Sequence, residues 1–282
     1  MKIVILGSTG ILGNTLKLYL NKKKITTKTI SREKNTKSNI NLKNFSNFKK
    51  LEKLITKHNP THVINCIGVT KFNKNYKNNK LTYLLNTKMP IYIARFCKTN
   101  KIYFIHVSTD CVFSGKKGNY ADISLKDSRD LYGISKSKGE VKNSFTTTIR
   151  TSFIGPELNT KNSLLNWFLA QNKSVNGYNN AFFSGITSLE LSKIIYNYSI
   201  KKNLLINKII NVGSSRISKY ELLCKIKKIF KKKNKIIRDP RFKIDRSLNS
   251  KKFIKLTKYK IVKWDKMLIE LKKFMAINQY KF

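Results

Sequence analysis

The sequence predicts an α/β fold built on a doubly wound parallel sheet, with a smaller C-terminal cap. Two observations predict it. Through the first half of the chain, short apolar runs alternate with helical patterns over short links, which is typical of right-handed crossovers between parallel strands. The first run, KIVIL at residues 2–6, leads straight into a glycine-rich loop and then into a helical pattern. That order of elements is typical of doubly wound sheets.

Each expected strand of the first half is a short run rich in Ile, Val, Thr or Tyr, which suits burial on both faces of a parallel sheet. The expected strands are 2–6, 25–30, 61–68, 101–108 and 146–152. Between them, apolar residues recur at helical spacing. The expected helices are 11–21, 48–58, 83–99 and 131–144, with a break in the third near Pro90.

The second half of the chain is less regular. Its patterns predict helices at 163–171, 188–202 and 219–232 and a strand at 209–214. No internal repeat or flexible linker separates the halves. We therefore expect a first domain over residues 1–150 and a C-terminal part over 151–282 that is intertwined with it, lending elements back to the first sheet.

The charge of the chain is unusual, because 59 Lys and Arg residues stand against 14 acidic ones in 282 residues, a formal net charge of +45. Such a charge can indicate a polyanionic partner. However, the basic residues are nearly all Lys, they are scattered, and Asn and Ile are also abundant, as AT-rich codons would produce. The densest cluster, 225–238, alternates with apolar residues as a solvated amphipathic helix would. We therefore expect no nucleic-acid partner.

The four cysteines form no CxxC pair, and the three histidines form no ligand cluster. This pattern suits reduced thiols in a cytoplasmic protein and no metal site, although a metal requirement stays open. The apolar run at the N-terminus is too short for a signal peptide, and no later run is long enough to span a membrane.

The glycine loop GSTGILG, residues 7–13, predicts a dinucleotide site of the Rossmann type. Gly7 permits a tight turn, Gly10 lets the backbone approach a pyrophosphate, and Gly13 lets the helix pack on the strand. Free N–H groups at the helix start would face the phosphates. The spacing is GxxGxxG, and a purely structural turn is the alternative. The expected contacts in this loop are Gly7, Thr9, Gly10, Ile11, Leu12 and Gly13.

The end of the second strand bears on the choice between NAD and NADP. NAD enzymes usually carry an acid there to hold the ribose 2′-hydroxyl, whereas this chain has Ser31 and Arg32. A hydroxyl and a guanidinium suit a 2′-phosphate, so we expect NADPH. NADH is less favoured, although Glu33, which comes just after, keeps it possible. Further expected cofactor contacts are Asn41 and Leu42 at the adenine, and Cys66, Ile67 and Gly68 under the cofactor.

The fourth strand ends in Ser108, Thr109 and Asp110, and Tyr132 and Lys136 lie one turn apart on the next helix. A phenol has a pKa of about 10, and a nearby ammonium would lower it and improve the phenol as a proton donor. The Thr109 hydroxyl could hydrogen-bond the same developing oxyanion. Together these groups supply what carbonyl reduction by a nicotinamide needs.

The glycine loop, INCIG, HVSTDCVFSG, YGISKSKGE and IRTSFIG resemble the extended short-chain dehydrogenase/reductases, and most of all the dTDP-4-dehydrorhamnose reductase family. The resemblance implies NADPH-dependent reduction of the 4-keto group of a nucleotide-linked 6-deoxy sugar, feeding O-antigen or other surface polysaccharide. It makes Thr109, Tyr132 and Lys136 the catalytic residues, with Lys136 also on the nicotinamide ribose. Asn86 and Ser108 would join the cofactor site, and a homodimer is compatible with it.

Two departures from the family pattern affect the expected substrate. Cys111 stands where the family usually has a tyrosine, and NGYNNAFFSGIT replaces the usual substrate strand. Both features resemble a sub-branch that acts on UDP-linked N-acetylated sugars, so the base and the C2 substituent stay open. The expected substrate contacts are Asp110, Cys111, Phe153, Asn180, Ser184 and Arg246.

Three other functions are alternatives to 4-keto reduction for a chain with this pattern. A 4,6-dehydratase usually carries an Asp-Glu pair after the threonine, and here Cys111 follows Asp110. An epimerase/reductase acting on a UDP-N-acetyl-6-deoxyhexosulose stays open, although epimerases usually have an acid at the end of the second strand. A non-catalytic NADP-binding regulatory subunit would be expected to have lost Thr109, Tyr132 or Lys136, and all three are present.

Overall fold

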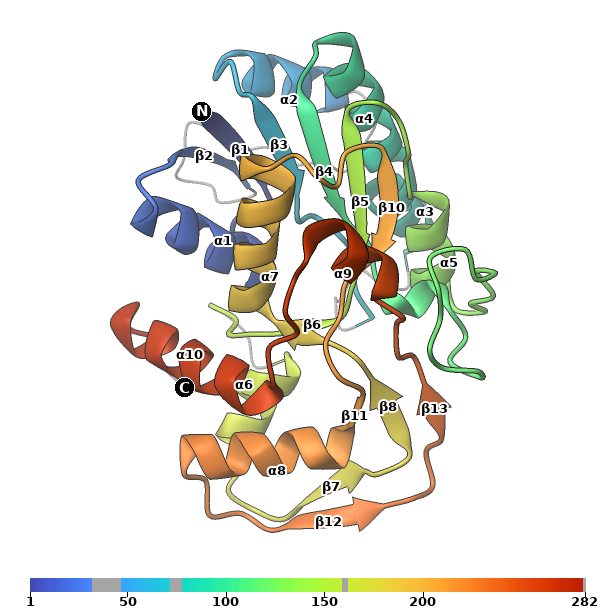
Figure 1. The fold of residues 1–282 in the computed structure, drawn as a ribbon, viewed down its shortest axis with the longest axis vertical. Helices are drawn as coiled ribbons and strands as arrows, with labels where there is room; N and C mark the ends of the chain where they lie inside the picture. Colours follow the sequence, from blue (N-terminus) through green and yellow to red (C-terminus); the bar gives the residue numbers. More distant parts are fainter. Residues whose placement is uncertain (32–46, 72–77, 159–161, 281–282) are drawn as a thin grey trace.

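A six-stranded parallel sheet lies in the upper half of the molecule (Figure 1). The computed structural model describes residues 1–31, 47–71, 78–158 and 162–280. The sheet has the order β10-β5-β4-β3-β1-β2, and every neighbouring pair is parallel. Its strands are β1 (Lys2–Leu6), β2 (Thr26–Ile30), β3 (His62–Asn65), β4 (Tyr103–Val107), β5 (Thr146–Arg150) and β10 (Lys208–Asn211). The predicted fold class is confirmed, and the strand order reverses between β1 and β3, where such sheets bind ligands.

The two faces of this sheet carry separate apolar cores, as the alternation of side chains along a strand requires. Ile3 and Ile5 of β1 belong to one cluster, which includes residues of α1 (Ile11–Lys22) and α7 (Ser188–Ile194). Val4 and Leu6 belong to the other, which includes residues of α2 (Asn47–Thr56) and α4 (Met89–Thr99). Both faces of β1 are therefore buried, which explains why its sequence is a continuous apolar run.

The helix expected to break near Pro90 does not break there. The chain runs through α3 (Asn79–Tyr83), a π-helical segment at Leu84–Lys88 and then α4. In the π-helical segment the Met89 N–H donates to the Leu84 carbonyl, five residues back. Pro90 stands in the first turn of α4, where its missing N–H costs little. The helical run therefore continues past the proline.

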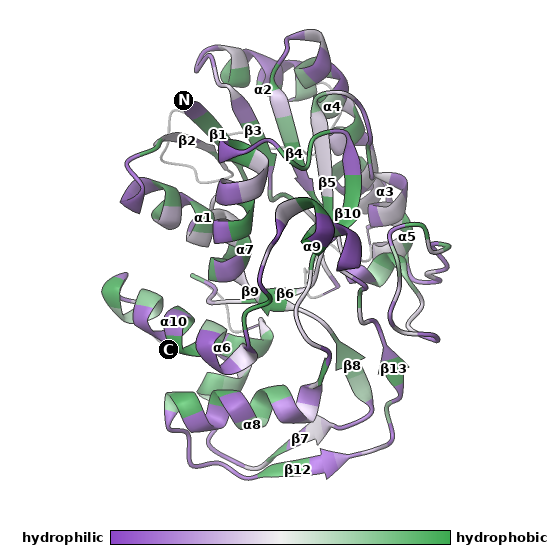
Figure 2. Ribbon diagram, in the orientation of Figure 1, coloured by the Kyte–Doolittle hydropathy of each residue, from purple (hydrophilic) through white to green (hydrophobic). Residues whose placement is uncertain are grey.

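The C-terminal part forms smaller sheets below the main one (Figure 1). These pair β7 (Val175–Tyr178) with β12 (Ile236–Asp239), β8 (Ala181–Phe183) with β11 (Ile217–Ser218) and β13 (Ile244–Asp245), and β6 (Phe153–Ile154) with β9 (Ile186–Thr187). The remaining helices are α5 (Leu131–Lys138), α6 (Leu164–Ala170), α8 (Lys219–Phe230), α9 (Lys251–Thr257) and α10 (Trp264–Ile277). Figure 2 shows α8 and α10 alternating between hydrophobic and hydrophilic residues, as surface helices do.

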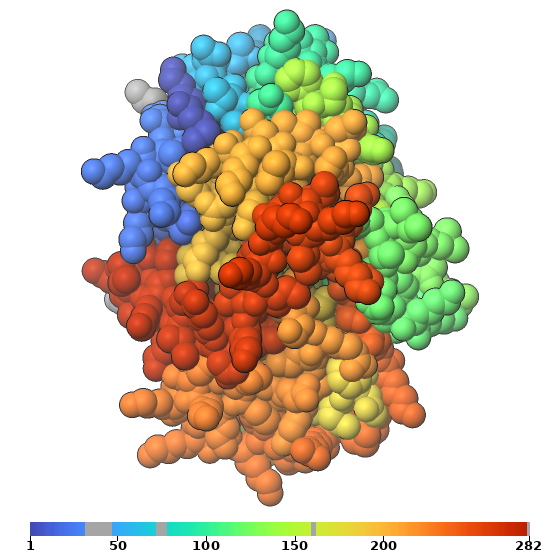
Figure 3. Space-filling model, viewed as in Figure 1, coloured from blue at the N-terminus to red at the C-terminus, as the bar shows by residue number. Residues whose placement is uncertain are grey.

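The two parts of the chain share elements and surface. β10 pairs with β5 at the edge of the main sheet, and α7 packs against α1. Figure 3 shows the C-terminal segment that carries α9 and α10, in red, lying across this face of the molecule between the upper sheet and the region around α8. Among the described residues, no helix is long and apolar enough to cross a membrane.

Several element boundaries differ from the prediction. The helix predicted over 131–144 ends at Lys138, and the backbone of its C-cap, Gly139, lies so close to the Asn86 carbonyl that a side chain would overlap it. The strand predicted over 61–68 ends at Asn65, and the helix predicted over 188–202 becomes π-helical from Ile195. The prediction lacked α10, although this helix buries Trp264, Met267, Leu268 and Leu271 at helical spacing.

Candidate functional site

The glycine loop shows which glycines the protein itself needs and which leave room for a ligand. Gly7 has a φ of +84°, and a Cβ there would lie 2.9 Å from a side-chain carbon of Ile67. A Cβ on Gly13 would overlap the Gly7 carbonyl oxygen. By contrast, a Cβ on Gly10 would have no protein atom nearer than 3.6 Å. Gly10 is therefore not required by packing, which suits a position where a pyrophosphate approaches the backbone.

The start of α1 is equipped to hold an anion. Gly10 is its N-cap and provides no side-chain hydrogen bond, and no acidic residue stands in the first turn. The first N–H groups of a helix lack partners within the helix and carry partial positive charge. Thr9, Ile11 and Leu12 flank this end as expected, so the residues present fit a dinucleotide phosphate.

The predicted cofactor contacts at the ends of β2 and β3 fall into two groups. Cys66 donates its N–H to the Leu6 carbonyl at 3.0 Å, and Gly7 packs against Ile67, so residues 66–68 lie beside the glycine loop. Ser31 is buried at the end of β2. Arg32, Asn41 and Leu42 lie outside the described residues, so the preference for NADPH stays a prediction.

The third strand also presents a polar pair that the sequence analysis did not single out. Asn65 donates from its side chain to Nδ1 of His106 at 3.0 Å, and both residues are fully buried. Burial lowers the pKa of His106 well below its usual value, so the ring is neutral. The pair joins β3 to β4 next to the cofactor end of the sheet.

The backbone of α5 is held directly against the turn that carries Thr109. A Cβ on Gly133 would overlap the Cys111 carbonyl oxygen, so only glycine permits this approach. The Asp130 side chain caps the helix by accepting from the Gly133 N–H at 2.9 Å. The packing brings the Tyr132 hydroxyl close to Thr109, whose hydroxyl opposes the rise of the Tyr132 pKa.

Thr109 is itself fixed by its neighbours in the short turn that follows β4. Its hydroxyl accepts from the Cys111 N–H at 3.1 Å and donates to Oδ1 of Asp110 at 3.2 Å. Lys136, one turn after Tyr132, donates from Nζ to the Val107 carbonyl at 2.7 Å. Thr109, Tyr132 and Lys136 are thus brought together at the carboxyl end of β4.

The electrostatics of Tyr132 differ from the prediction. Its pKa is raised, first by burial and then by the charge of Cys111, while the Thr109 hydroxyl opposes the shift. Lys136 was expected to lower this pKa, but its ammonium is directed to the Val107 carbonyl and is not among the groups that shift it. Tyr132 is therefore firmly protonated at neutral pH. Burial lowers the pKa of Lys136 to about 8, against an opposing effect of Glu140.

Glu140 anchors this region, although the sequence analysis gave it no role. Its carboxylate is fully buried and accepts from Nε and Nη2 of Arg150 at 2.8 and 2.9 Å. It also accepts from the Ser108 hydroxyl at 2.9 Å. Ser108, expected at the cofactor, therefore directs its hydroxyl toward Glu140. The signal that could have found Glu140 is an acid one turn after Lys136 in a chain with few acids.

The Asn86 side chain makes its hydrogen bonds within the protein. Its side-chain amide donates to the Val69 carbonyl and to the Ser135 hydroxyl, each at 3.0 Å, and its oxygen accepts from the Val69 N–H at 2.8 Å. These bonds tie α5 to the segment that follows β3. Asn86 thus connects the cofactor-side loop to the helix of Tyr132.

The predicted substrate contacts are only partly brought together. Asp110, Cys111 and Arg246 lie side by side, with Nη1 of Arg246 3.4 Å from the Cys111 sulfur. Ser184 exchanges hydrogen bonds with the Leu248 backbone, and Asn180 donates to the Pro240 carbonyl at 3.1 Å. Among the described residues, neither of these two bonds to the catalytic three.

Phe153 lies in β6, where its half-buried side chain packs against the apolar cluster that contains Ile3 and Ile5. Lys219, which was not predicted as a site residue, places its ammonium 3.6 Å from the centre of the Phe183 ring. Burial lowers its pKa, and the charge of Asp110 opposes that shift. Lys219 stands at the first position of α8, where the helix dipole disfavours a cation, and that mismatch is the signal that could have found it.

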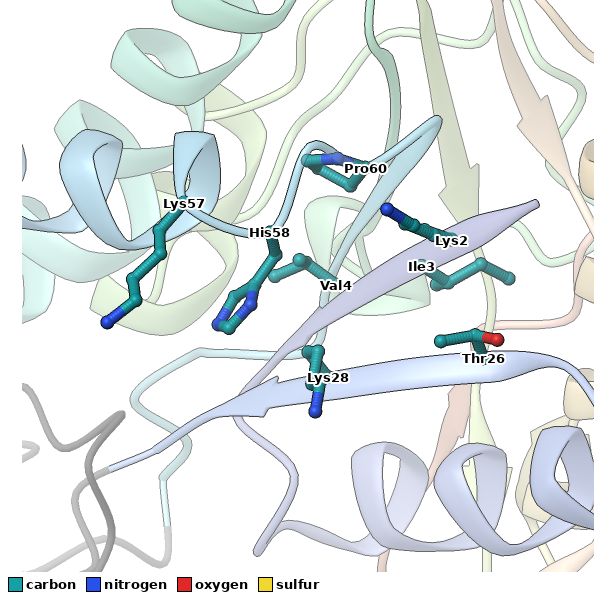
Figure 4. Close-up of a pocket in the computed structure, with 8 residues that line it drawn as sticks. All are labelled: Lys2, Ile3, Val4, Thr26, Lys28, Lys57, His58 and Pro60. Carbon is teal, nitrogen blue, oxygen red and sulfur yellow. The ribbon is translucent and has the colours of Figure 1, made fainter.

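A separate pocket lies at the other end of the sheet (Figure 4). It has a volume of about 190 Å³ and is lined by the start of β1, by β2 and by the segment after α2, including Lys28, Lys57 and His58. These residues are at the opposite strand ends from Thr109, so the pocket is not part of the site described above.

In the described ranges, no group of three or more His, Cys, Asp or Glu side chains could hold a metal.

Comparisons with known proteins agree with this architecture. The profile of the family described as the RmlD substrate binding domain matches residues 1–174. A dTDP-4-keto-6-deoxy-D-glucose reductase of Streptomyces niveus is 30% identical over 88 residues, a match that covers 31% of each chain.

Solved structures give similarity over a larger share of the chain. The dTDP-4-dehydrorhamnose reductase of Bacillus anthracis in complex with NADP superposes with a TM-score of 0.82 over 97% of this chain and 99% of its own, at 18% identity. A hypothetical dTDP-4-dehydrorhamnose reductase of Sulfolobus tokodaii gives a TM-score of 0.77 over 94% and 98%, at 26% identity.

Proposed function

Because this chain belongs to the RmlD substrate binding domain family, we propose that it is an NADPH-dependent reductase of the 4-keto group of a nucleotide-linked 4-keto-6-deoxy sugar. The observation that carries the proposal is the meeting of Thr109, Tyr132 and Lys136 at the carboxyl end of β4. The similarity to a dTDP-4-keto-6-deoxy-D-glucose reductase supports the substrate class. Such a product would feed a surface polysaccharide.

Different parts of the chain would bind different parts of the cofactor. The N-terminus of α1 and the open backbone at Gly10 would hold the pyrophosphate. Residues 66–68 would lie under the cofactor, and Lys136 would bond the nicotinamide ribose. NADPH, when bound, supplies the hydride for the reduction. Ser31 and Arg32 would favour its 2′-phosphate.

The proton comes from the protein. Tyr132 has a raised pKa and is protonated at neutral pH, so it can donate its proton to the carbonyl oxygen as negative charge develops there. Thr109, whose hydroxyl contacts Tyr132, donates a hydrogen bond to the same oxygen in place of its bond to Asp110. Lys136 donates to the Val107 carbonyl and is not among the groups that shift the pKa of Tyr132, so its role here would be to hold the nicotinamide ribose.

The test is NADPH consumption with two substrates, dTDP-4-keto-6-deoxyglucose and a UDP-linked 4-keto-6-deoxy-N-acetylhexosamine. Oxidation with either supports the reductase, and the preferred substrate identifies the nucleotide and the C2 substituent. Tight NADPH binding without oxidation of either would contradict the proposal and favour an epimerase or a regulatory subunit.

A matched pair of variants tests the proton donor. Tyr132→Phe should keep the affinity for NADPH and lower turnover by about 10²- to 10⁴-fold, the usual contribution of a general acid. Tyr178→Phe, an exposed tyrosine in β7, is the control and should leave turnover unchanged. Retained turnover in Tyr132→Phe would remove this phenol from the mechanism.

A further inference from the structure

The pocket at the start of β1 and β2 has a lining of one charge sign (Figure 4). Three lysines and one histidine line it, and no acidic residue does. Its volume is about 190 Å³. Pockets that enclose drug-sized ligands usually measure about 300 to 1,000 Å³, so this one suits a smaller ligand. The pocket is therefore a small cavity with a positive lining.

The lysine charges around the pocket are not neutralised within the described part of the chain. There, no ion pair joins Lys2, Lys28 or Lys57 to an acidic side chain. The three lysines come from different segments: the start of β1, the middle of β2 and the first residue after α2. Like charges gathered around one cavity repel one another, so an anion between them would stabilise the cluster.

His58 gives a second, independent indication of a ligand. Its Nε2 atom is buried, and in the described ranges it has no hydrogen-bond partner. Buried polar atoms are usually hydrogen-bonded, and an exception can mark a missing ion or water. Figure 4 shows the His58 ring between Lys57 and Lys28. A neutral imidazole with its proton on Nε2 can donate to an anion in the pocket.

The arrangement of these donors suits a phosphate group better than a carboxylate. A phosphate carries a charge of about −1.5 to −2 and offers at least three acceptor oxygens in different directions, whereas a carboxylate has one charge and two oxygens in a plane. The donors here approach from three segments of the chain. Thr26 also lines the pocket, and its hydroxyl can donate to one of the oxygens.

We propose that this pocket binds a phosphate dianion through Lys28, Lys57 and His58. Lys2 and Thr26 complete the lining. The pocket and the Thr109 turn are at opposite strand ends, so the bound ion would be separate from the cofactor phosphates. The inference therefore does not depend on the proposed function. The ion is either free phosphate or the phosphate group of a small ester.

Histidine NMR tests the pocket locally, because the chain has only three histidines. His58→Gln identifies the His58 imidazole signal. The protein is titrated with inorganic phosphate and with glucose 6-phosphate, and each titration is compared with sodium chloride at the same ionic strength. His106 is fully buried on β4 and serves as the internal reference.

Phosphate should shift the His58 signal saturably and tighten its proton binding about 10-fold, because a nearby negative charge favours the imidazolium. Lys28→Gln and Lys57→Gln should each weaken phosphate binding about 10-fold, since each removes a charged donor. Lys228→Gln, at an exposed lysine on α8, makes the same change in net charge and should bind phosphate as the wild type does.

Two results would overturn the inference. One is a His58 response to chloride as large as the response to phosphate. The other is equal phosphate binding by Lys28→Gln, Lys57→Gln and Lys228→Gln. The two phosphate titrations identify the source of the group: a stronger response to inorganic phosphate assigns the free ion, and a stronger response to the ester assigns a phosphorylated metabolite.

Discussion

Lys136 makes the stability of this protein depend on pH in a way that one substitution can isolate. Its ammonium is buried, and its pKa falls from 10.5 to about 8 on folding, with burial as the main cause. Because the folded state binds the proton less tightly than the unfolded state, Lys136 costs stability at neutral pH. That cost is present in full below about pH 8 and disappears as pH rises from about 8 to about 10.5.

The size of the effect follows from the two pKa values. A shift of this size corresponds to a cost of about 3 kcal/mol at pH 7. At pH 9.5 Lys136 is largely deprotonated in the folded state while it is still mostly protonated in the unfolded state, and the remaining cost is about 1 kcal/mol. Lys136 should therefore make the wild type about 2 kcal/mol more stable at pH 9.5 than at pH 7, apart from what all other groups contribute.

Urea unfolding followed by far-UV circular dichroism measures this effect. The free energy of unfolding is compared between wild type and Lys136→Met at pH 7, 8.5 and 9.5, so that the other titrating groups cancel. The difference between the two proteins should move by about 2 kcal/mol across this range in favour of the wild type. Lys142→Met, an exposed lysine on the segment after α5, should track the wild type. Parallel curves for wild type and Lys136→Met would refute the burial argument.

Three further predictions concern the cofactor site and its support. Gly10→Ala should fold normally and bind NADPH more weakly, whereas Gly13→Ala should lower the free energy of unfolding. The reason is that a Cβ on Gly13 overlaps protein atoms and a Cβ on Gly10 does not. Thermal melts measure the first property of each variant and NADPH titrations the second. Glu140→Gln should cost about 3 kcal/mol in urea unfolding, since it leaves the Arg150 guanidinium buried without its carboxylate, and a neutral result would show that this pair is solvated. Arg32→Ala should weaken NADPH far more than NADH in the same titration, and an equal loss for both would exclude a contact with the 2′-phosphate.

Most of the main sheet could be read from the sequence because β1, β3, β4 and β5 are buried over most of their length. Runs such as KIVIL are continuously apolar, so their positions, and the helices between them, were clear without tertiary information. The edge strand β2 is half-exposed, and its Thr-rich run was the signal there. The strand expected at 209–214 is present as β10, but the strands of the smaller C-terminal sheets were not predicted, because they contain only two to four residues, too few to show a period. The helix at 264–277 has a visible apolar spacing that could have predicted it.

The electrostatic prediction for Tyr132 failed for a reason of geometry. Spacing along a helix placed Tyr132 and Lys136 on one face, and this was correct. Spacing does not say what the ammonium binds, and here it binds the Val107 carbonyl of the neighbouring strand. Burial then dominates the pKa of the phenol.

Local sequence information was enough to predict the strand–helix order and the glycine loop at the start of α1. It was also enough to identify Thr109, Tyr132 and Lys136 as site candidates beyond the end of the fourth strand. Each depends on residues within one strand or a few helical turns. Tertiary packing was needed to pair Glu140 with Arg150, and to bring Arg246 to within 3.4 Å of the Cys111 sulfur from more than a hundred residues away in the sequence. Such contacts depend on how the C-terminal part packs onto the sheet, because side-chain charges meet only after distant segments are brought together.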